Sequence, residues 1–289
     1  MRIFVTGATG FIGSAVVQEL LGGGHQVLGL SRSEAGAAAL AAAGAEVHRG
    51  SLEDLASLQR GAAAAEAVIH TAFIHDFSTF AKNAETDRLA IEAITVTLAG
   101  SGKPFIVSSG CLGLRTEDDA PGHGFPRKSE ASGLAAAAQG VRAMVMRLPP
   151  SVHGDGDHGF VPTLIEAARR NGFAMYVGEG KNLWPAVHRL DAARLYRLAL
   201  EKGTAGARLH AVADEGIPTR AIAETIGRRL NVPVVSKTPE EATALLGLIG
   251  QVLGMGGPTS SAVTRQRLDW NPTRPGLVED LEKGRYFEA

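Results

Sequence analysis

Seven residues near the N-terminus carry the clearest chemical signal in the sequence. Residues 7–13 read GATGFIG and directly follow an apolar run at 2–6. At such a place the first glycine permits a tight turn, the second lets the backbone approach a pyrophosphate, and the third allows close packing of a helix on a strand. Backbone N–H groups at the start of that helix would face the phosphates. The pattern predicts a dinucleotide-binding loop, the alternative being a glycine-rich turn without a ligand. The expected cofactor contacts are Gly7, Thr9, Gly10, Phe11, Ile12 and Gly13.

The residues after the second apolar run predict which dinucleotide is bound. A site that prefers NAD carries Asp or Glu about 20 residues beyond the glycines, where it binds the ribose 2′-hydroxyl. Here that place is taken by Ser31, and Arg32 comes next. A guanidinium binds a 2′-phosphate through charge-assisted hydrogen bonds. We therefore expect NADP(H), with Ser31 and Arg32 as ligands. The alternative is that Arg32 is a solvated surface residue.

The elements that position these residues follow from the alternation of apolar runs with helical stretches. Strands that alternate with helices of about ten residues indicate parallel pairing through right-handed crossovers. Near-continuous apolar strands are typical of a sheet covered on both faces. The expected fold is α/β, a doubly wound parallel sheet. Its strands are expected at 2–6, 26–30, 46–48, 67–70, 104–108 and 142–148, and its helices at 10–21, 34–43, 52–60, 82–99 and 130–139.

The second half of the chain has a looser rhythm. Residues 238–241 (TPEE) form a capping box that opens a helix with an apolar stripe between Leu245 and Leu253. The stripe packs on the core, or else forms a substrate lid or a subunit contact. We expect a dinucleotide-binding domain at 1–150, completed by about 184–213, and a small C-terminal cap at 151–183 and 214–289. Within this half a loop is expected at 152–159, helices at 162–170, 190–202 and 220–230, and a strand at 208–212.

Composition and charge exclude several classes of protein. The 289 residues include 29 Lys and Arg against 30 Asp and Glu, a net charge of −1, which is unlike a nucleic-acid binder. The single cysteine, Cys111, cannot form an internal disulfide framework and fits a reducing compartment. The start lacks a signal-peptide pattern, and the longest apolar stretch, at 244–255, is too short to span a membrane. We expect a cytoplasmic protein with no nucleic acid and no membrane as partner.

The whole chain also resembles the short-chain dehydrogenase/reductase superfamily in its extended form, the NAD-dependent epimerase/dehydratase type. The matching segments are VTGATGFIG (5–13), GSLEDLASL (50–58), VIHTAF (68–73), FIVSSG (105–110), RLPPSVHG (147–154), WPAVHRLDAARL (184–195) and LDWNP (268–272). The resemblance implies a Rossmann fold, a small-molecule substrate and a possible homodimer. It also implies cofactor contacts at Ser51, Leu52, Thr71, Ala72, Phe73, Ser108, Pro149 and Val152.

One pair of residues that the superfamily uses is missing. Its members carry Tyr-x-x-x-Lys shortly after the strand with the catalytic serine, and the lysine lowers the pKa of the tyrosine, which ordinarily titrates near 10. The tyrosines here are Tyr176, Tyr196 and Tyr286, and none has lysine four positions later. In the expected segment at 121–133, both possible registers put glycine, at 122 or 124, in the place of tyrosine. The resemblance therefore implies an atypical active site.

Other side chains are candidates for the work of the missing tyrosine. Ser109 offers a hydroxyl to polarise a carbonyl, the alternative being an inert residue at a strand end. His123 is a candidate proton donor near neutral pH, or else only a loop residue. The loop HGDGDH at 153–158 matches neither a calcium nor a zinc pattern, so no metal is predicted. The expected substrate contacts are His75, Phe77 and His153.

These patterns together favour an NADP(H)-dependent oxidoreductase that transfers hydride with a small carbonyl or alcohol substrate. Ser109 would polarise the substrate oxygen, and His123 or water would supply the proton. A sugar-nucleotide epimerase or dehydratase is an alternative, but those reactions also need the tyrosine. A non-catalytic NADPH-binding regulator is the alternative from another class, because loss of the tyrosine is what such a protein would display.

Overall fold

The computed structural model describes residues 1–121 and 127–288, apart from the side chain of Phe77. Within that part of the chain, seven strands form a parallel central sheet in the order β3-β2-β1-β4-β5-β6-β10. The strand order reverses between β1 and β4, and ligands of open α/β sheets bind at the carboxyl edge beside such a point. The predicted doubly wound sheet is confirmed. Its strands are β1 (Arg2–Thr6), β2 (Gln26–Ser31), β3 (Glu46–Arg49), β4 (Ala67–His70), β5 (Pro104–Gly110), β6 (Arg142–Leu148) and β10 (Arg208–His210).

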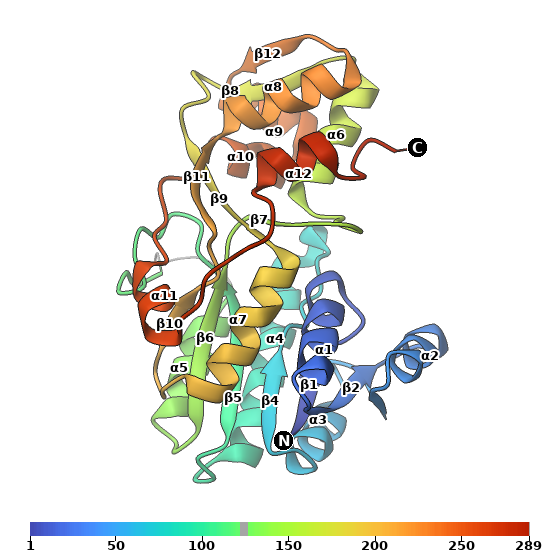
Figure 1. The fold of residues 1–289 in the computed structure, drawn as a ribbon, viewed down its shortest axis with the longest axis vertical. Coiled ribbons are helices and arrows are strands. Elements are labelled where there is room, and N and C mark those ends of the chain that lie inside the picture. Colours follow the sequence, from blue (N-terminus) through green and yellow to red (C-terminus); the bar gives the residue numbers. More distant parts are fainter. Residues whose placement is uncertain (122–126, 289) are drawn as a thin grey trace.

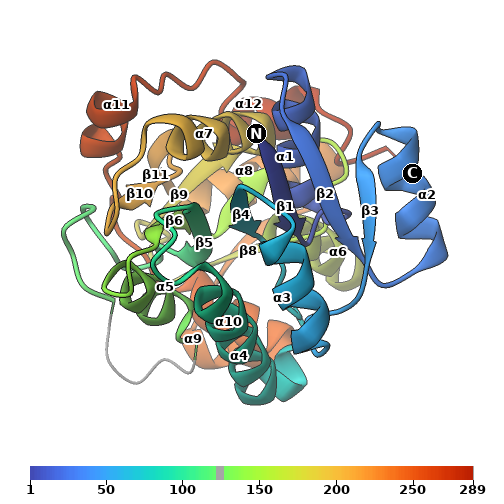
Figure 2. The ribbon, with the colours of Figure 1, turned by 90° about the horizontal axis from the view of Figure 1, so that it is seen from below.

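Helices cover both faces of this sheet and enclose two apolar cores (Figure 2). One face is covered by α1 (Phe11–Gly22) and α7 (Arg189–Lys202), whose buried side chains belong to one core. The other is covered by α3 (Leu55–Ala63), α4 (Phe80–Leu98) and α5 (Ser129–Ala137). The short α2 (Glu34–Ala42) lies beside β2 and β3. Because both faces are buried, the strands are apolar nearly throughout.

A third apolar core lies beyond the carboxyl edge of the central sheet (Figure 1). Two small sheets, β11-β9-β7 and β12-β8, contribute to this part of the molecule, which we call the cap. The division of the chain into a cofactor domain and a substrate-binding cap stays a prediction. The strands of the cap are β7 (Ser151–His153), β8 (Ala174–Val177), β9 (Leu183–His188), β11 (Asp214–Pro218) and β12 (Val234–Lys237). Its helices are α6 (Phe160–Asn171), α8 (Thr219–Leu230), α9 (Pro239–Leu246), α10 (Leu248–Leu253) and α12 (Leu277–Lys283).

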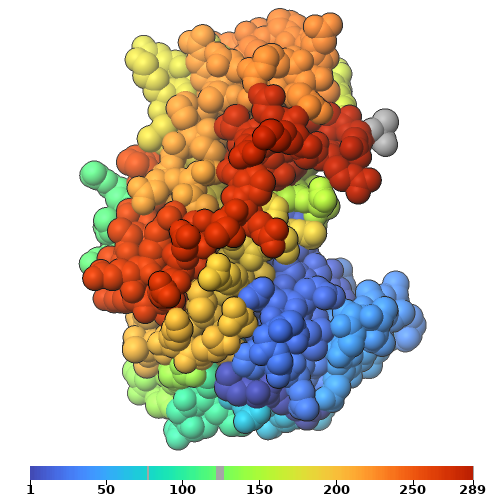
Figure 3. Space-filling view, in the orientation of Figure 1, coloured from blue at the N-terminus to red at the C-terminus, as the bar shows by residue number. Residues whose placement is uncertain are grey.

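The last part of the chain ties the cap to the central sheet. After α10 it reaches α11 (Ala262–Leu268), beside β10, and then returns along α7 to α12 in the cap (Figures 1 and 3). Asp191, in the first turn of α7, accepts hydrogen bonds from the backbone N–H groups of Thr273 and Arg274 at 3.1 and 2.9 Å. Trp270 is buried and donates from its indole to the Asp191 carbonyl. These bonds fix the returning segment against α7.

Two expectations for the second half are wrong. The loop expected at 152–159 includes β7 at its start, which pairs with β9. The single helix expected after the capping box is two helices, α9 and α10, because Gly247 between them has φ +59° and ends the first. Such a left-handed backbone interrupts a right-handed helix. Most of the apolar stripe, including Leu245 and Leu253, does pack on the third core. Among the residues described, no helix is long and apolar enough to cross a lipid bilayer.

Candidate cofactor and substrate site

The glycine loop between β1 and α1 has the close packing that only glycine permits. Gly7 has φ +68°, and a Cβ there would lie 2.7 Å from both the Ala72 backbone nitrogen and Thr71 Oγ1. A Cβ on Gly13 would lie 1.9 Å from the Gly7 carbonyl oxygen, which is a clash. Gly10 precedes α1 without any side-chain cap. Backbone donors at the start of α1 therefore have no side chain between them and a phosphate, and the residues fit a dinucleotide.

The end of β4 lies directly beside this loop. Thr71 Oγ1 donates to the Thr6 carbonyl at 2.8 Å, which ties the residue after β4 to β1. The Ala72 backbone nitrogen lies 3.4 Å from Thr6 Oγ1. Of the expected contacts, Thr71 and Ala72 are thus brought together with Gly7 and Gly13. Pro149, after β6, is buried, and Val152 lies half-buried in β7.

The expected adenosine end of the site is built from the ends of β2 and β3. Ser33 caps α2 by accepting from the Gly36 backbone nitrogen at 3.1 Å, and Ser31 Oγ donates to the Ser33 carbonyl at 3.0 Å. A Cβ on Gly36 would lie 2.6 Å from Ser31 Oγ and 3.2 Å from Thr9 Cγ2, so Thr9 faces this corner. Arg32 is exposed and makes no hydrogen bond or ion pair with a described residue.

A second arginine at this corner was not predicted from the sequence. Arg49 donates to the Ser33 carbonyl at 2.8 Å and pairs with Glu34. The register of β2 with β3, which sets Ser31 against Arg49, brings it there. Ser51 and Leu52 follow β3, and Leu52 packs against the second core. The placement of Ser51 beside an adenine stays a prediction.

Under the carboxyl edge of β1, β4 and β5 lies a buried hydrogen-bond network that we call the His70 network. His70 Nδ1 lies 2.8 Å from Thr6 Oγ1, and its Nε2 lies 3.1 Å from Asp87 Oδ1. A carboxylate only accepts, so Nε2 carries the proton and Nδ1 accepts from the threonine hydroxyl. All three residues are fully buried. The sequence placed His70 at a strand end but gave no sign that Asp87, seventeen positions later, would meet it.

The network continues through a serine to an arginine. Ser129 Oγ donates to the second carboxylate oxygen of Asp87 and accepts from Arg127 Nε at 2.7 Å. Burial alone would raise the pKa of Asp87, but the hydrogen bond from His70 and the charge of Arg127 lower it below its usual range. Asp87 is therefore an ionised carboxylate that holds Arg127 through a hydroxyl.

Two adjacent serines at the end of β5 face different surroundings. Ser108 is buried; its hydroxyl donates to the His70 carbonyl at 2.7 Å and accepts from the Tyr196 hydroxyl at 2.6 Å. Ser109 is half-buried, and its hydroxyl makes no hydrogen bond within the described part of the chain. Successive side chains of a strand point to opposite sides. Ser109 is thus the one of the two whose hydroxyl is not already committed.

The three tyrosines are engaged elsewhere. Tyr196, on α7, is fully buried, and burial raises its pKa above the usual range. Tyr286 accepts from the Gly154 backbone nitrogen at 2.9 Å and donates to Asp157 at 3.0 Å. Tyr176 lies in β8 of the cap, under the guanidinium of Arg220. The absence of the superfamily's catalytic tyrosine stays a prediction.

The segment expected to hold the missing pair is partly visible. Residues 122–126, and with them His123, lie outside the described residues. Glu130 is buried and accepts from Arg147 at 2.6 and 2.9 Å and from Arg208 at 3.0 Å. It therefore joins α5 to β6 and β10. Lys128 is exposed.

The expected substrate contacts have different environments. His75 keeps more than a third of its surface exposed, with its ring edge-on to Phe73; the protein atoms around the ring, which partly desolvate it, and the positive charges of Arg127 and His158 lower its pKa. His153 is fully buried, and its Nδ1 lies 2.7 Å from Asp280 of α12. Direct contact of His153 with a substrate stays a prediction, as does that of Phe77. The structure describes no cluster of three or more His, Cys, Asp or Glu side chains that would hold a metal ion.

Residues of the cap and of α7 lie against the glycine loop, which the sequence did not predict. The ring of His158 packs edge-on against Phe11, the first residue of α1, at 5.8 Å. The guanidinium of Arg189 lies 5.1 Å from the centre of the same ring. An imidazole and a guanidinium thus flank the start of α1.

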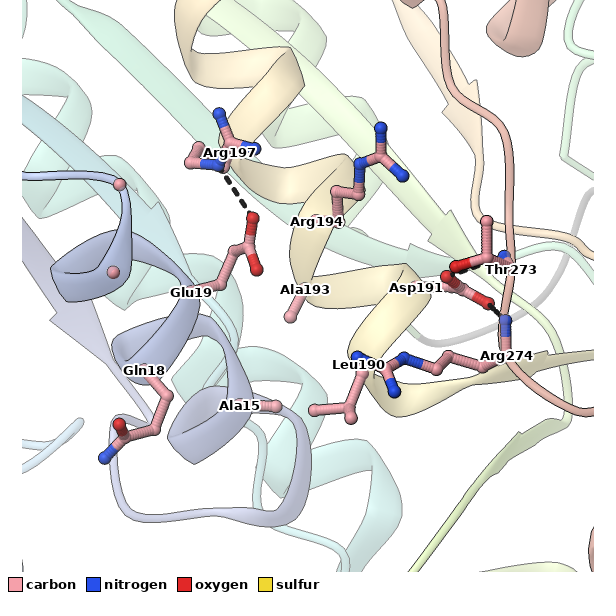
Figure 4. Close-up of a pocket in the computed structure, with 12 residues that line it drawn as sticks. Ala15, Gln18, Glu19, Leu190, Asp191, Ala193, Arg194, Arg197, Thr273 and Arg274 are labelled. Atoms are coloured by element: carbon pink, nitrogen blue, oxygen red, sulfur yellow. Dashed lines mark hydrogen bonds and ion pairs between the residues drawn. The ribbon is translucent and has the colours of Figure 1, made fainter.

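A groove of about 570 Å³ lies apart from these residues, on the outer side of α1 and α7 (Figure 4). An ion pair between Glu19 and Arg197, 2.7 Å long, crosses between the two helices. None of the predicted site residues lines this groove. We therefore build the candidate site from the loop, the strand ends and the His70 network.

A parallel sheet whose reversal point carries this glycine loop defines a doubly wound α/β protein of the dinucleotide-binding type. The chain belongs to the NAD-dependent epimerase/dehydratase family, whose model matches residues 3–100. An uncharacterized protein of Schizosaccharomyces pombe is 51% identical over 99% of this chain and 100% of its own. The expected family resemblance is confirmed.

More distant proteins carry names that describe an activity. The 4-hydroxy-2-methyl-3-oxo-4-farnesyl-3,4-dihydroquinoline-1-oxide ketoreductase of Stigmatella aurantiaca is 29% identical over 71% of this chain and 66% of its own. The solved structure of dTDP-glucose 4,6-dehydratase from Streptomyces venezuelae, with NAD bound, has a TM-score of 0.78 at 19% identity and covers 99% of this chain and 97% of its own. The latter likeness concerns the fold.

Proposed function

We propose that the protein is an NADP(H)-dependent oxidoreductase acting on a small carbonyl or alcohol compound. The observation that carries this proposal is the pairing of the glycine loop with Ser31, Arg32 and the capped start of α2 at the end of β2. When bound, the nicotinamide would supply or accept a hydride. The loop residues Gly7 to Gly13 would hold the pyrophosphate, and Thr71 and Ala72 would border the ribose on the nicotinamide side.

The preference for NADP(H) rests on charge at the end of β2. An acidic residue there would repel a 2′-phosphate, but position 31 is a serine whose hydroxyl is already bound to the Ser33 carbonyl. Arg32 is exposed, with its guanidinium uncommitted among the described residues. Such a group is suited to a bidentate bond with a phosphate.

The proposed chemistry assigns substrate polarisation to Ser109 and proton supply to His123 or water. Ser109 is supported by its half-buried, uncommitted hydroxyl at the end of β5. His75 is a weaker base than an ordinary histidine: because its pKa is lowered, the imidazole is neutral near pH 7 and carries no extra proton to donate. The name of the related ketoreductase supports reduction of a carbonyl as the direction.

A non-catalytic NADPH-binding regulator is the second candidate. It is favoured by the hydrogen bonds that the hydroxyls of Tyr196 and Tyr286 make to Ser108 and Asp157, and by the place of Tyr176 in the cap. Such a protein would bind the cofactor tightly and turn over no substrate.

The experiment that tests the proposal combines a cofactor titration with a turnover panel. NADPH and NADH are titrated against the wild type, Arg32→Ala and, as a control, Arg170→Ala, which removes an exposed arginine at the end of α6. We expect Arg32→Ala to weaken NADPH binding by about tenfold or more, because the 2′-phosphate loses its guanidinium partner. The affinity for NADH should stay unchanged, because NADH carries no 2′-phosphate. Equal wild-type affinities for the two cofactors would exclude the NADP assignment.

NADPH consumption is then measured with a panel of ketones, aldehydes and imines. Turnover that falls in His123→Ala would support the proton-donor assignment. Tight NADPH binding without any turnover would favour the regulator.

A further inference from the structure

Arg127 fixes a guanidinium at the carboxyl edge of the central sheet. Its Cζ atom lies over the ring of Phe73, a residue that follows β4, at 4.1 Å from the ring centre. Nη2 donates to the Ser108 carbonyl in β5 at 3.0 Å, and Nε donates to Ser129 Oγ at 2.7 Å. A ring contact and two hydrogen bonds in different directions leave the side chain little rotational freedom. The group is therefore held in place before any ligand arrives.

Part of this guanidinium is uncommitted. Arginine has five N–H donors, and only the two bonds above are made with the described residues. Nη1 makes no hydrogen bond to any of them. The residue as a whole is half-buried, and burial of its guanidinium lowers the pKa of Arg127, so an anionic partner would be favourable there. The free N–H groups can donate hydrogen bonds to the oxygen atoms of a ligand.

The charge of Arg127 is not neutralised by a direct ion pair with a described carboxylate. Asp87 is the carboxylate that acts on it, and the hydroxyl of Ser129 stands between the two. Asp87 is also bound by His70. The other titratable groups close to Arg127 include His75, whose pKa it lowers, and the hydroxyl of the buried Tyr196. A half-buried cation in such surroundings favours an anionic ligand.

We propose that Arg127 binds a carboxylate of the substrate, so that the substrate is a carbonyl compound that also carries a carboxylate. This inference rests on the proposed oxidoreductase function and adds the class of substrate. The position separates this anion from the cofactor phosphates, because the phosphate loop follows β1, whereas Phe73 follows β4 and Ser108 lies near the end of β5. The His70 network acts as the positioning device: Asp87 and Ser129 hold the guanidinium without consuming its free donors.

The test measures binding and does not depend on turnover. Acetate, acetoacetate and 3-oxooctanoate, with the methyl esters of the two oxo acids, are titrated by calorimetry against the complex with NADP⁺, which cannot reduce them. The variants are Arg127→Gln and Arg127→Lys. Arg220→Gln is the matched control, because Arg220 also lies over an aromatic ring and pairs with a neighbour, but in the cap.

We expect at least one oxo acid to bind to the wild type and to Arg220→Gln more tightly than its ester. Arg127→Gln should weaken the acid by about 10- to 100-fold, as expected for loss of a charged hydrogen-bond donor, and leave the ester unchanged. If Arg127→Gln does not fold, as judged by circular dichroism, Arg127→Lys carries the test, with about threefold to tenfold weaker binding because the planar fork is lost.

Two results would overturn the inference: no acid binds better than its ester, or the folded Arg127 variant binds the acid as the wild type does. Failure of the proposed function is separate, because it would appear as absence of NADPH binding or of NADPH oxidation in the turnover panel. A reductase that accepts acid and ester equally would keep its proposed function and lose this substrate class.

Discussion

Ser108 and Ser109 are adjacent in β5 and perform different tasks. Ser108 links three elements, since its hydroxyl bridges the His70 carbonyl of β4 and the Tyr196 hydroxyl of α7. Ser109 has no such partner within the described residues. Removal of each hydroxyl should therefore change a different property of the protein.

Ser109→Ala should lower kcat/KM by about 100-fold and leave NADPH affinity and thermal stability unchanged, because one polarising donor is lost. Ser108→Ala is the matched control. It should cost about 1–3 kcal/mol in the free energy of unfolding, because the buried Tyr196 hydroxyl loses its partner. Steady-state kinetics and urea unfolding of both variants distinguish the two effects. Full activity of Ser109→Ala would remove this serine from the mechanism even if the enzyme class is right.

At the scale of elements, the glycine loop joins β1, α1 and the end of β4 so closely that each depends on the others. The approach is closest at Gly13, which lies within the first turns of α1. A methyl group there cannot be accommodated by rotation of a side chain, because its nearest neighbour is backbone.

Gly13→Ala should abolish dinucleotide binding and lower stability by about 1–3 kcal/mol, because α1 must move away from β1. Gly22→Ala is the control at the other end of the same helix, where an added Cβ meets nothing within 4 Å. It should leave cofactor affinity unchanged. Fluorescence titration with NADPH and thermal unfolding measure both properties. Unchanged NADPH affinity in Gly13→Ala would mean that the loop does not hold the pyrophosphate.

The sequence was informative about such local features and less so about long-range ones. The loop was predictable because its constraints lie within seven residues and require glycine itself. The strands β8 and β12 were missed because each has four residues and, among the described strands, pairs only with the other, from a distant part of the chain. Arg127 was missed for the same reason. Ser129 and Asp87, which hold it, are 42 positions apart, and the sequence pattern of neither segment predicts the hydrogen bond between them.

At the scale of the whole molecule, several histidines are held in surroundings that disfavour their charge. Burial lowers the pKa of His188 and His210, and also that of His75. In the unfolded chain each would titrate near 6.5. Below that pH the unfolded state binds more protons than the folded state, so the free energy of unfolding falls as the pH falls.

The urea midpoint should therefore decrease between about pH 7.5 and about pH 5.5 at constant ionic strength. Burial raises the pKa of Asp157, so this carboxyl makes the free energy of unfolding fall as the pH rises, which is opposite to the effect of the histidines. Its effect begins at lower pH, because an ordinary aspartate titrates near 3.9. His75→Asn, at an exposed position, should make the decrease shallower. A midpoint that stays constant or rises over this range would contradict the assignment of neutral histidines.

The pairing of β8 with β12 has a consequence for synthesis of the chain. The final strand of the central sheet, β10 (Arg208–His210), leaves the ribosome before β12 (Val234–Lys237), so the central sheet has all its strands while β8 still lacks its partner. Until then, apolar side chains of α6 and β8 such as Val161 and Met175 have no complete core to enter. Pairings between distant segments are slow to form, and exposed apolar surface promotes aggregation. Synthesis in this order gives a stage at which all strands of the central sheet are present and the cap core is incomplete, and at that stage the apolar surface of the cap is most exposed to aggregation.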